Sequence, residues 1–210
     1  MTNLGSKILF GQLTRRGLGD MLKHRDNPLK DESSVTAIAP ILVGVYDGFT
    51  WVRCEGKGSF LNAPRLKRYG EERAEAGERL VVVDLGGCTG MDSTFMGTLA
   101  GLALRLRKAG GGALHVAAPG ERNRASLEDL GLGELLAVDP PEAWWRGRME
   151  EARAGLVPLG EPQVLTDRQR AEQVLEAHRV LSANHEPNAR KFAGVMQVFE
   201  QELATKPGHA

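Results

Sequence analysis

Short apolar runs alternate with amphipathic segments between residues 40 and 139, and this alternation constrains the fold more than any other feature of the sequence. Three runs, Ile41–Tyr46, Phe49–Cys54 and Leu80–Leu85, are rich in β-branched or aromatic residues, as is typical of buried strands. Asp47-Gly48, a hairpin turn signal, separates the first two. The pattern predicts an α/β layer with a mostly parallel sheet, to which the hairpin adds one antiparallel strand.

The helices of this region are predicted from the spacing of their apolar residues. Phe95, Leu99, Leu102 and Leu106 recur every three or four positions, which places them on one face of a helix. The run Gly110-Gly111-Gly112 ends that helix. The expected elements, in chain order, are strands 41–46 and 49–54, helix 64–76, strand 80–85, helix 94–109, strand 113–117, helix 121–130 and strand 135–138.

The flanking regions differ from this α/β region in composition. Residues 1–39 mix glycines with scattered charges, which predicts a poorly ordered arm with at most a short helix. Residues 140–166 contain four prolines and a Trp144-Trp145 pair, and we interpret them as a Pro-rich linker that holds one short helix. Residues 167–204 show two amphipathic segments, with Asp167 as the expected N-cap of the first, and predict an antiparallel helical hairpin. Residues 205–210 are a tail.

The helical hairpin cannot be stable alone, because isolated helices of about 16 residues are marginal in water. It must therefore pack on the α/β domain or on another chain. The α/β domain looks complete without it, so we expect the hairpin to serve partner binding or self-association.

Charge and hydropathy exclude two classes of partner. The chain has 27 Lys and Arg against 27 Asp and Glu, so it lacks the basic surplus that nucleic-acid binding needs. No apolar run approaches the roughly 20 residues that span a bilayer, and the N-terminus does not resemble a secretory signal. We therefore expect a cytoplasmic protein without a membrane span, in which Cys54 and Cys88 are reduced thiols.

Catalytic and cofactor motifs are not evident. None of the five histidines stands beside a nucleophile or in a metal-ligand spacing, and His178 falls among leucines on a helix face, where a packing role is expected. The glycines 110–112 follow a helix and precede a strand, the reverse of a dinucleotide-binding loop. We expect no enzymatic activity, no metal and no cofactor.

The segment Asp92-Ser93-Thr94 joins a buried strand and its loop to the next helix. Asp92 can cap the free backbone N–H groups of that helix, and this is ordinary capping chemistry. A second interpretation is functional: a phosphate on Ser93 would suit a helix N-terminus, where backbone donors and the helix dipole favour negative charge.

The same stretch resembles the signature of the STAS domain, the fold of bacterial anti-sigma factor antagonists. In that family a strand that ends near an aspartate is followed by a loop and by Asp-Ser-Ser-Gly or a close variant, which stands here as Asp92-Ser93-Thr94-Phe95. Phe95 departs from the family pattern, which often has glycine there. Residues 55–63 resemble the family's loop into the first helix, and the resemblance extends over residues 40–139.

The resemblance implies a protein switch. Ser93 would be the phosphoacceptor of a partner anti-sigma factor with GHKL-type kinase activity, which uses ATP, and a PP2C-type phosphatase would reverse the modification. The unmodified form would bind the anti-sigma factor and free the sigma factor for transcription. The expected partner-contact surface around Ser93 consists of Asp92, Thr94, Ser59, Asn62, Phe95 and Met96. The alternative is a STAS binding or scaffold module that works without phosphorylation, for example as a subunit of a membrane lipid-transport complex.

Overall fold

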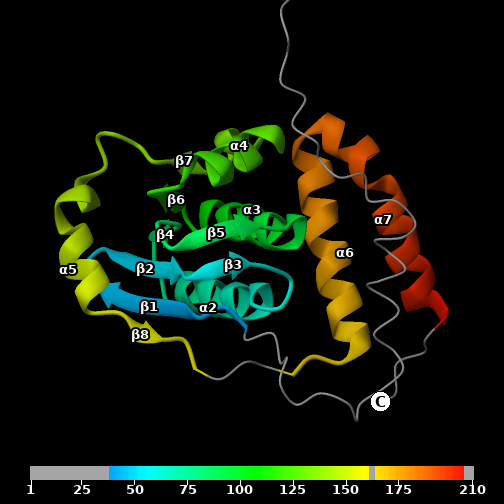
Figure 1. Ribbon diagram of the computed structural model, residues 1–210, viewed down its shortest axis with the longest axis horizontal. Coiled ribbons are helices and arrows are strands. Elements are labelled where there is room, and N and C mark those ends of the chain that lie inside the picture. The colour runs from blue at the N-terminus through cyan, green and yellow to red at the C-terminus, as the bar shows by residue number, and fades with distance from the viewer. Residues whose placement is uncertain (1–37, 161–163, 206–210) are drawn as a thin grey trace, which may run out of the picture. The chain divides into compact units, whose positions relative to one another are not determined.

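A six-stranded sheet organises residues 38–160 and 164–205, which are the residues that the computed structural model describes (Figure 1). The strands lie in the order β7-β6-β4-β2-β1-β8. Four of them, β2, β4, β6 and β7, are parallel, whereas β1 runs antiparallel to both of its neighbours. Their bounds are β1 Ile41–Tyr46, β2 Phe49–Cys54, β4 Leu80–Asp84, β6 Ala113–Ala117, β7 Ala137–Val138 and β8 Val157–Pro158. The mostly parallel sheet with an antiparallel hairpin strand is confirmed.

A second, two-stranded sheet was not predicted. It pairs β3, Gly56–Gly58, with β5, Cys88–Met91, in parallel. Both strands are short and contain glycine, so neither carries a strand pattern in the sequence. The pairing brings the loop that follows β2 beside the segment that leads into α3.

The helices of the α/β region end within a residue or two of their predicted bounds. They are α2 Ala63–Glu75, α3 Ser93–Lys108 and α4 Glu121–Asp129. The predicted strand 135–138 is shorter than expected: a 3₁₀ turn, Leu132–Glu134, precedes it and only Ala137–Val138 pairs with β6.

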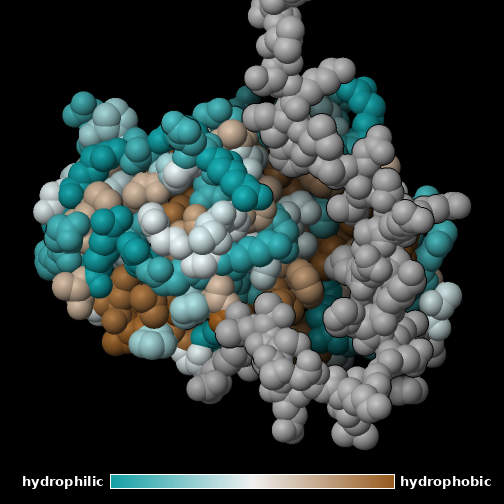
Figure 2. Space-filling view, in the orientation of Figure 1, coloured by the Kyte–Doolittle hydropathy of each residue, from teal (hydrophilic) through white to brown (hydrophobic). Residues whose placement is uncertain are grey.

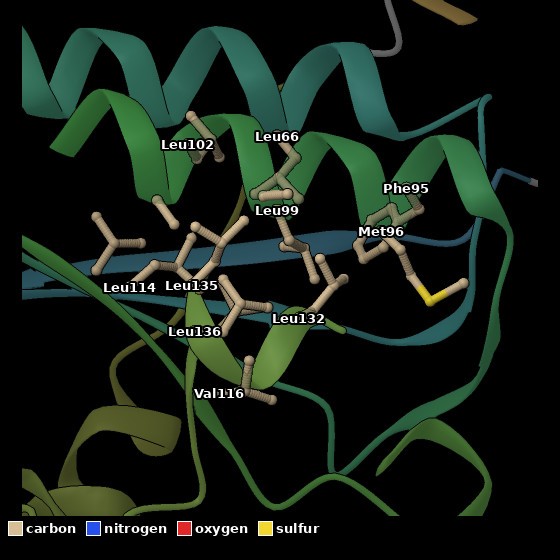
Figure 3. Close-up of a cluster of buried hydrophobic side chains, with 14 of the residues drawn as sticks. Leu66, Phe95, Met96, Leu99, Leu102, Leu114, Val116, Leu132, Leu135 and Leu136 are labelled. Carbon is tan, nitrogen blue, oxygen red and sulfur yellow. The ribbon is translucent and has the colours of Figure 1, made fainter. Parts of the chain in front are cut away.

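The strands bury both faces of the sheet, because successive side chains of a strand point to opposite sides. The larger core lies between the sheet and helices α2 and α3, where Leu66, Leu99 and Val116 are fully buried (Figure 3). On β2, Val52 belongs to this core, whereas its neighbour Trp51 belongs to a second cluster on the other face.

Residues 140–160, interpreted from the sequence as a linker, cover that second face. The 3₁₀ helix η3, Trp144–Arg148, and α5, Met149–Ala154, contribute buried side chains to it, and β8 pairs with β1. Trp145 is fully buried and packs edge-on against Trp51, with 5.5 Å between ring centroids. The second face of β2 is apolar and has to be shielded from water, which is the reason that this segment packs on the sheet.

A buried ion-pair cluster ties α5 to the sheet. The fully buried carboxylate of Asp84, at the end of β4, accepts hydrogen bonds from Arg53 Nη1 at 2.8 Å and from Arg153 Nε at 2.8 Å. The backbone N–H of Gly86 donates to the same carboxylate at 2.9 Å. Burial by itself raises the pKa of Asp84, but these donors outweigh it and hold the pKa below its usual value.

The C-terminal helices are α6, Asp167–Asn184, and α7, Glu186–Thr205. Thr166, not Asp167, is the N-cap of α6: its hydroxyl accepts from the Gln169 N–H, and the Gln169 side chain accepts from the Thr166 N–H. This reciprocal capping box satisfies two free donors, which Asp167 alone cannot do. α7 begins at Glu186 and accommodates Pro187 in its first turn, where the missing N–H of proline costs no helical hydrogen bond.

The helix pair packs on the α/β domain. Helix α6 lies against α3 and α7 lies beside α6 (Figure 1). The buried amide of Asn188 in α7 donates to the carbonyl oxygens of Leu130 at 3.0 Å and Leu181 at 3.1 Å. The sequence analysis favoured partner binding or self-association for this helix pair, whereas the structure shows it packed on the α/β domain. The predicted N-terminal arm up to residue 37 and tail residues 206–210 lie outside the described residues.

Candidate functional site

Asp92 is the N-cap of α3, as the sequence predicted, and its carboxylate also holds a neighbouring loop. Oδ1 accepts from the Phe95 N–H at 2.8 Å, and Oδ2 accepts from the Phe60 N–H at 2.8 Å. The Asp92 N–H in turn donates to the carbonyl oxygen of Gly58 at 3.0 Å. Asp92 therefore joins the start of α3 to the loop that follows β3.

Burial raises the pKa of the Asp92 carboxyl, because water no longer stabilises its charge. The N–H groups of Phe95 and Phe60, and the charges of Lys57 and His178, act in the opposite direction without cancelling the effect. A second negative group placed beside Asp92 would meet a carboxylate that is already poorly solvated.

Asn62 holds the loop from within. Its side chain is fully buried, accepts from the Ser59 N–H at 2.8 Å, and donates to the carbonyl oxygens of Lys57 at 3.0 Å and Ala39 at 3.2 Å. An asparagine side chain with both ends bonded to backbone fixes the course of a loop. Asn62 thus positions Ser59 and Phe60 beside α3.

Phe95 packs inward, into the larger core. Its side chain is fully buried, and a Cβ added at Gly58 would lie 2.8 Å from its ring. Gly58 is therefore needed for this close approach, and the phenylalanine that departs from the family pattern does not project from the surface. Figure 3 shows Phe95 among the core side chains.

The structure brings the expected contact residues together around the start of α3, but four of the six are not on the surface. The prediction of an exposed set is corrected for Asn62, Thr94, Phe95 and Met96, which are all buried. Packing explains this: the two side chains that follow Thr94 in α3 belong to the core, and Asn62 pins the loop. Ser59, Asp92 and Ser93 are half-buried.

Ser93 is covered by a residue of the C-terminal helix pair. Its Oγ lies 2.9 Å from Nε2 of His178 in α6, which is 85 residues away in sequence. Nδ1 of the same imidazole lies 2.7 Å from the carbonyl oxygen of Val174. Because a carbonyl oxygen can only accept, Nδ1 carries the proton, so Nε2 accepts from the Ser93 hydroxyl in the neutral ring. Burial lowers the pKa of His178, which favours this neutral form.

His178 fulfils its predicted packing role as well. The side chain is buried and meets the ring of Phe192 edge-on, with 4.8 Å between centroids. The sequence signalled that this face of α6 is buried, through the spacing of Ala171, Val174, His178 and Leu181. It carried no signal for what the face packs against, so the contact with Ser93 was missed.

The start of α3 has the features of an anion-binding position. Among the described residues, no group of three His, Cys, Asp or Glu side chains is placed to hold a metal ion. The Ser93 hydroxyl lies in the first turn of α3, at the positive end of the helix dipole, where a phosphate ester is stabilised. Lys57 contributes positive charge at this corner, as its effect on Asp92 shows.

Known proteins resemble part of the chain. A protein-family model described as the STAS domain matches residues 41–143. No curated protein matches. Solved structures that are similar include the anti-sigma factor antagonist SpoIIAA in its unphosphorylated form (17% identity, 55% of this chain, 97% of that chain, TM-score 0.45). The phosphorylated form of this Bacillus protein is also similar (17% identity, 54% of this chain, 98% of that chain, TM-score 0.43). So is an anti-sigma factor antagonist from Mycobacterium paratuberculosis (21% identity, 54% of this chain, 92% of that chain, TM-score 0.43). No helix in residues 38–160 and 164–205 is long and apolar enough to cross a membrane.

Proposed function

We propose that this chain, whose residues 41–143 match the STAS domain model, acts as an anti-sigma factor antagonist, in a partner switch controlled by reversible phosphorylation of Ser93. The observation that carries the proposal is the Asp92-Ser93 pair at the start of α3. Asp92 caps the helix and ties it to the loop at Ser59 and Phe60, so the Ser93 hydroxyl has a fixed position beside that loop. The role is regulatory, and the chain needs no cofactor of its own.

The proposed chemistry is phosphoryl transfer in both directions. A partner anti-sigma factor with GHKL-type kinase activity transfers the γ-phosphoryl group of ATP to Ser93 Oγ, which loses its proton, and ADP leaves. A PP2C-type phosphatase hydrolyses the ester and restores the hydroxyl. The phosphate adds a charge of about −1.5 to −2 beside the poorly solvated Asp92 carboxylate. Like-charge repulsion and desolvation then weaken the docked anti-sigma factor, with no refolding of the domain.

The test is affinity capture from native cells with wild-type, Ser93→Ala and Ser93→Asp proteins. We expect the wild-type and alanine proteins to retain an anti-sigma factor of the GHKL type, identified by mass spectrometry, and the aspartate protein to lose it. Ser126→Asp, which places the same charge on α4, is the matched control and should retain the partner. Equal recovery with Ser93→Asp and Ser126→Asp would overturn the proposal, as would the absence of phosphate on Ser93 under every growth and stress condition.

One observation supports a second candidate function. The Ser93 hydroxyl is engaged by His178 and α6 lies over it, which suits a STAS module that binds a partner without being phosphorylated. Such a module could be a scaffold or a subunit of a membrane lipid-transport complex. Persistent absence of phosphate on Ser93, together with co-purification of a transport permease, would select this alternative.

A further inference from the structure

Helix α6 packs closely against the face of α3 that carries Gly97 and Gly101, which we call the outer face of α3. A Cβ added at Gly97 would lie 2.5 Å from the backbone oxygen of Ala177 and 2.8 Å from its Cβ. The two helices approach this closely because both residues are small. The contact begins one turn beyond Ser93, whose hydroxyl donates to His178 in the next position of α6.

The face that α6 uses is mainly apolar, and its buried residues are Ala171, Gln173, Val174, Leu175, Ala177, His178 and Leu181. Leu181 belongs to the larger core, and Phe192 of α7 closes over the His178 ring. Helix α6 therefore packs on α3 as a protein partner would, with a specific polar contact at Ser93.

The packing between the two helices is incomplete. A crevice of about 240 Å³ runs between α2, α3 and α6, lined by residues that include Gly97, Gly101 and Val180. Gln173 also lines it, and its buried Nε2 has no hydrogen-bond partner. The ion pair between Lys67 and Glu176 at the rim is half exposed, so it contributes little. The void and the unsatisfied donor weaken the binding of α6 to α3, so another protein that binds this face can displace α6.

We infer that the outer face of α3 is a helix-binding surface that α6 occupies within the same chain, so that a partner protein reaches Ser93 only by displacing α6. The inference rests on the proposed function of Ser93. With α6 in place, the hydroxyl proton is held by Nε2 of His178 and the residue is half-buried, so a kinase cannot align Ser93 for attack on a γ-phosphate. Displacement of α6 frees the hydroxyl and exposes the α3 face together.

Two glycines of α3 give a matched pair of variants that tests this. Gly97→Ala forces a Cβ against the backbone of Ala177, whereas at Gly101 the nearest atom is Cγ2 of Val180 at 3.9 Å, an ordinary contact. Both substitutions raise the helix propensity of α3 equally. Only Gly97→Ala should push α6 away.

The displacement of α6 is measured in the full chain as the accessibility of a thiol placed at position 93. In a Ser93→Cys background, alkylation of residue 93 by iodoacetamide is followed by peptide mass spectrometry. We expect the rate to rise severalfold with Gly97→Ala and to stay unchanged with Gly101→Ala. Equal rates in the two variants would overturn the inference.

An engineered disulfide that holds α6 against α3 gives the opposite experiment, and it does not depend on whether Gly97→Ala folds well. The oxidised double variant is called the locked protein. The positions of Gly101 and Val180 are in contact, so cysteines are introduced at both. Oxidised glutathione then converts the two thiols into a disulfide and is itself reduced. With the captured kinase and ATP in the absence of reductant, the locked protein should gain much less phosphate on Ser93 than its reduced form. Equal phosphorylation of locked and reduced protein overturns the inference. If Ser93 is never phosphorylated but the thiol assay shows the expected opening, α6 stands as a cover and the proposed phosphoswitch fails instead.

Discussion

The indole N–H of Trp145 donates a hydrogen bond to Nδ1 of His115 at 2.9 Å, on the face of the sheet opposite α3. The contact attaches residues 140–160 to the second face of the sheet. Burial lowers the pKa of His115, so its ring is neutral and can accept this bond.

Trp145→Ala should destabilise the protein strongly, because the indole fills the second core and makes this bond. We expect a loss of about 3–5 kcal/mol in the free energy of unfolding, measured by urea denaturation. Trp144→Ala is the matched control: Trp144 is 55% exposed, and its edge-on contact with Phe49 is worth about 1 kcal/mol. Similar losses for the two variants would contradict the assigned role of Trp145.

Replacing Asp84 by asparagine should be costly, because two guanidinium groups would lose their buried counter-charge. For Asp84→Asn we expect a loss of about 3–5 kcal/mol, read from chemical denaturation. Glu150 pairs with the same Arg153 but its side chain is 91% exposed, so Glu150→Gln should change stability by about 0.5 kcal/mol or less. A small effect for Asp84→Asn would show that α5 does not depend on this cluster.

Removal of the Asp92 side chain should destabilise the start of α3. Asp92→Ala leaves the N–H groups of Phe95 and Phe60 without their acceptor, and we expect a loss of about 1–2 kcal/mol in thermal unfolding. Asp92→Asn keeps one carbonyl acceptor and removes the buried charge, so its loss should be smaller. The opposite order of the two variants would refute the capping geometry.

Acid should loosen α6 through His178. Burial holds its pKa below the ordinary value of about 6.5, although the carbonyl of Val174 and the charge of Asp92 act in the opposite direction. The unfolded or undocked ring therefore binds a proton first as the pH falls. The neutral His178 ring stabilises the docking of α6 on α3 in full above about pH 6.5. This stabilisation is lost progressively as the pH falls from there toward the lower pKa of the docked ring.

The measurement is amide hydrogen exchange of α6 against pH. Within residues 38–160 and 164–205, the side chains that interact with His178 are those of Ser93, Asp92 and Phe192. His178→Gln can bond Ser93 without titrating, so it should flatten the pH dependence in α6. An unchanged dependence in this variant would remove His178 as its cause. The bond of His115 to Trp145 is a second acid-sensitive contact, but it affects the opposite face.

The strands and helices of residues 41–138 were largely predictable, because each carries its own periodicity. Asp92 was predictable as a cap for the same reason: capping depends on residues within one turn. The paired strands Gly56–Gly58 and Cys88–Met91 were not, since they are short, contain glycine and are defined by their contact with each other.

The covered faces could not be derived from single segments. Phe49 and Trp51 made the second face of β2 apolar, which implied a cover, but nothing local identified Trp145 as part of it. The contact of Ser93 with His178 depends on where an independently predicted helix docks. The inward turn of Phe95 likewise depends on the absence of a side chain at Gly58.

Helix α6 is tethered to the surface that it covers, since only the short segment between Pro158 and Asp167 joins it to β8. A tether of this kind gives α6 an effective concentration on the order of millimolar at the α3 face. A free helix of micromolar affinity for that face would displace it only when the competitor is abundant or gains contacts elsewhere. Proteolytic cleavage between Pro158 and Asp167 would abolish this advantage, so a nicked protein should respond to competitor concentrations that leave the intact chain closed.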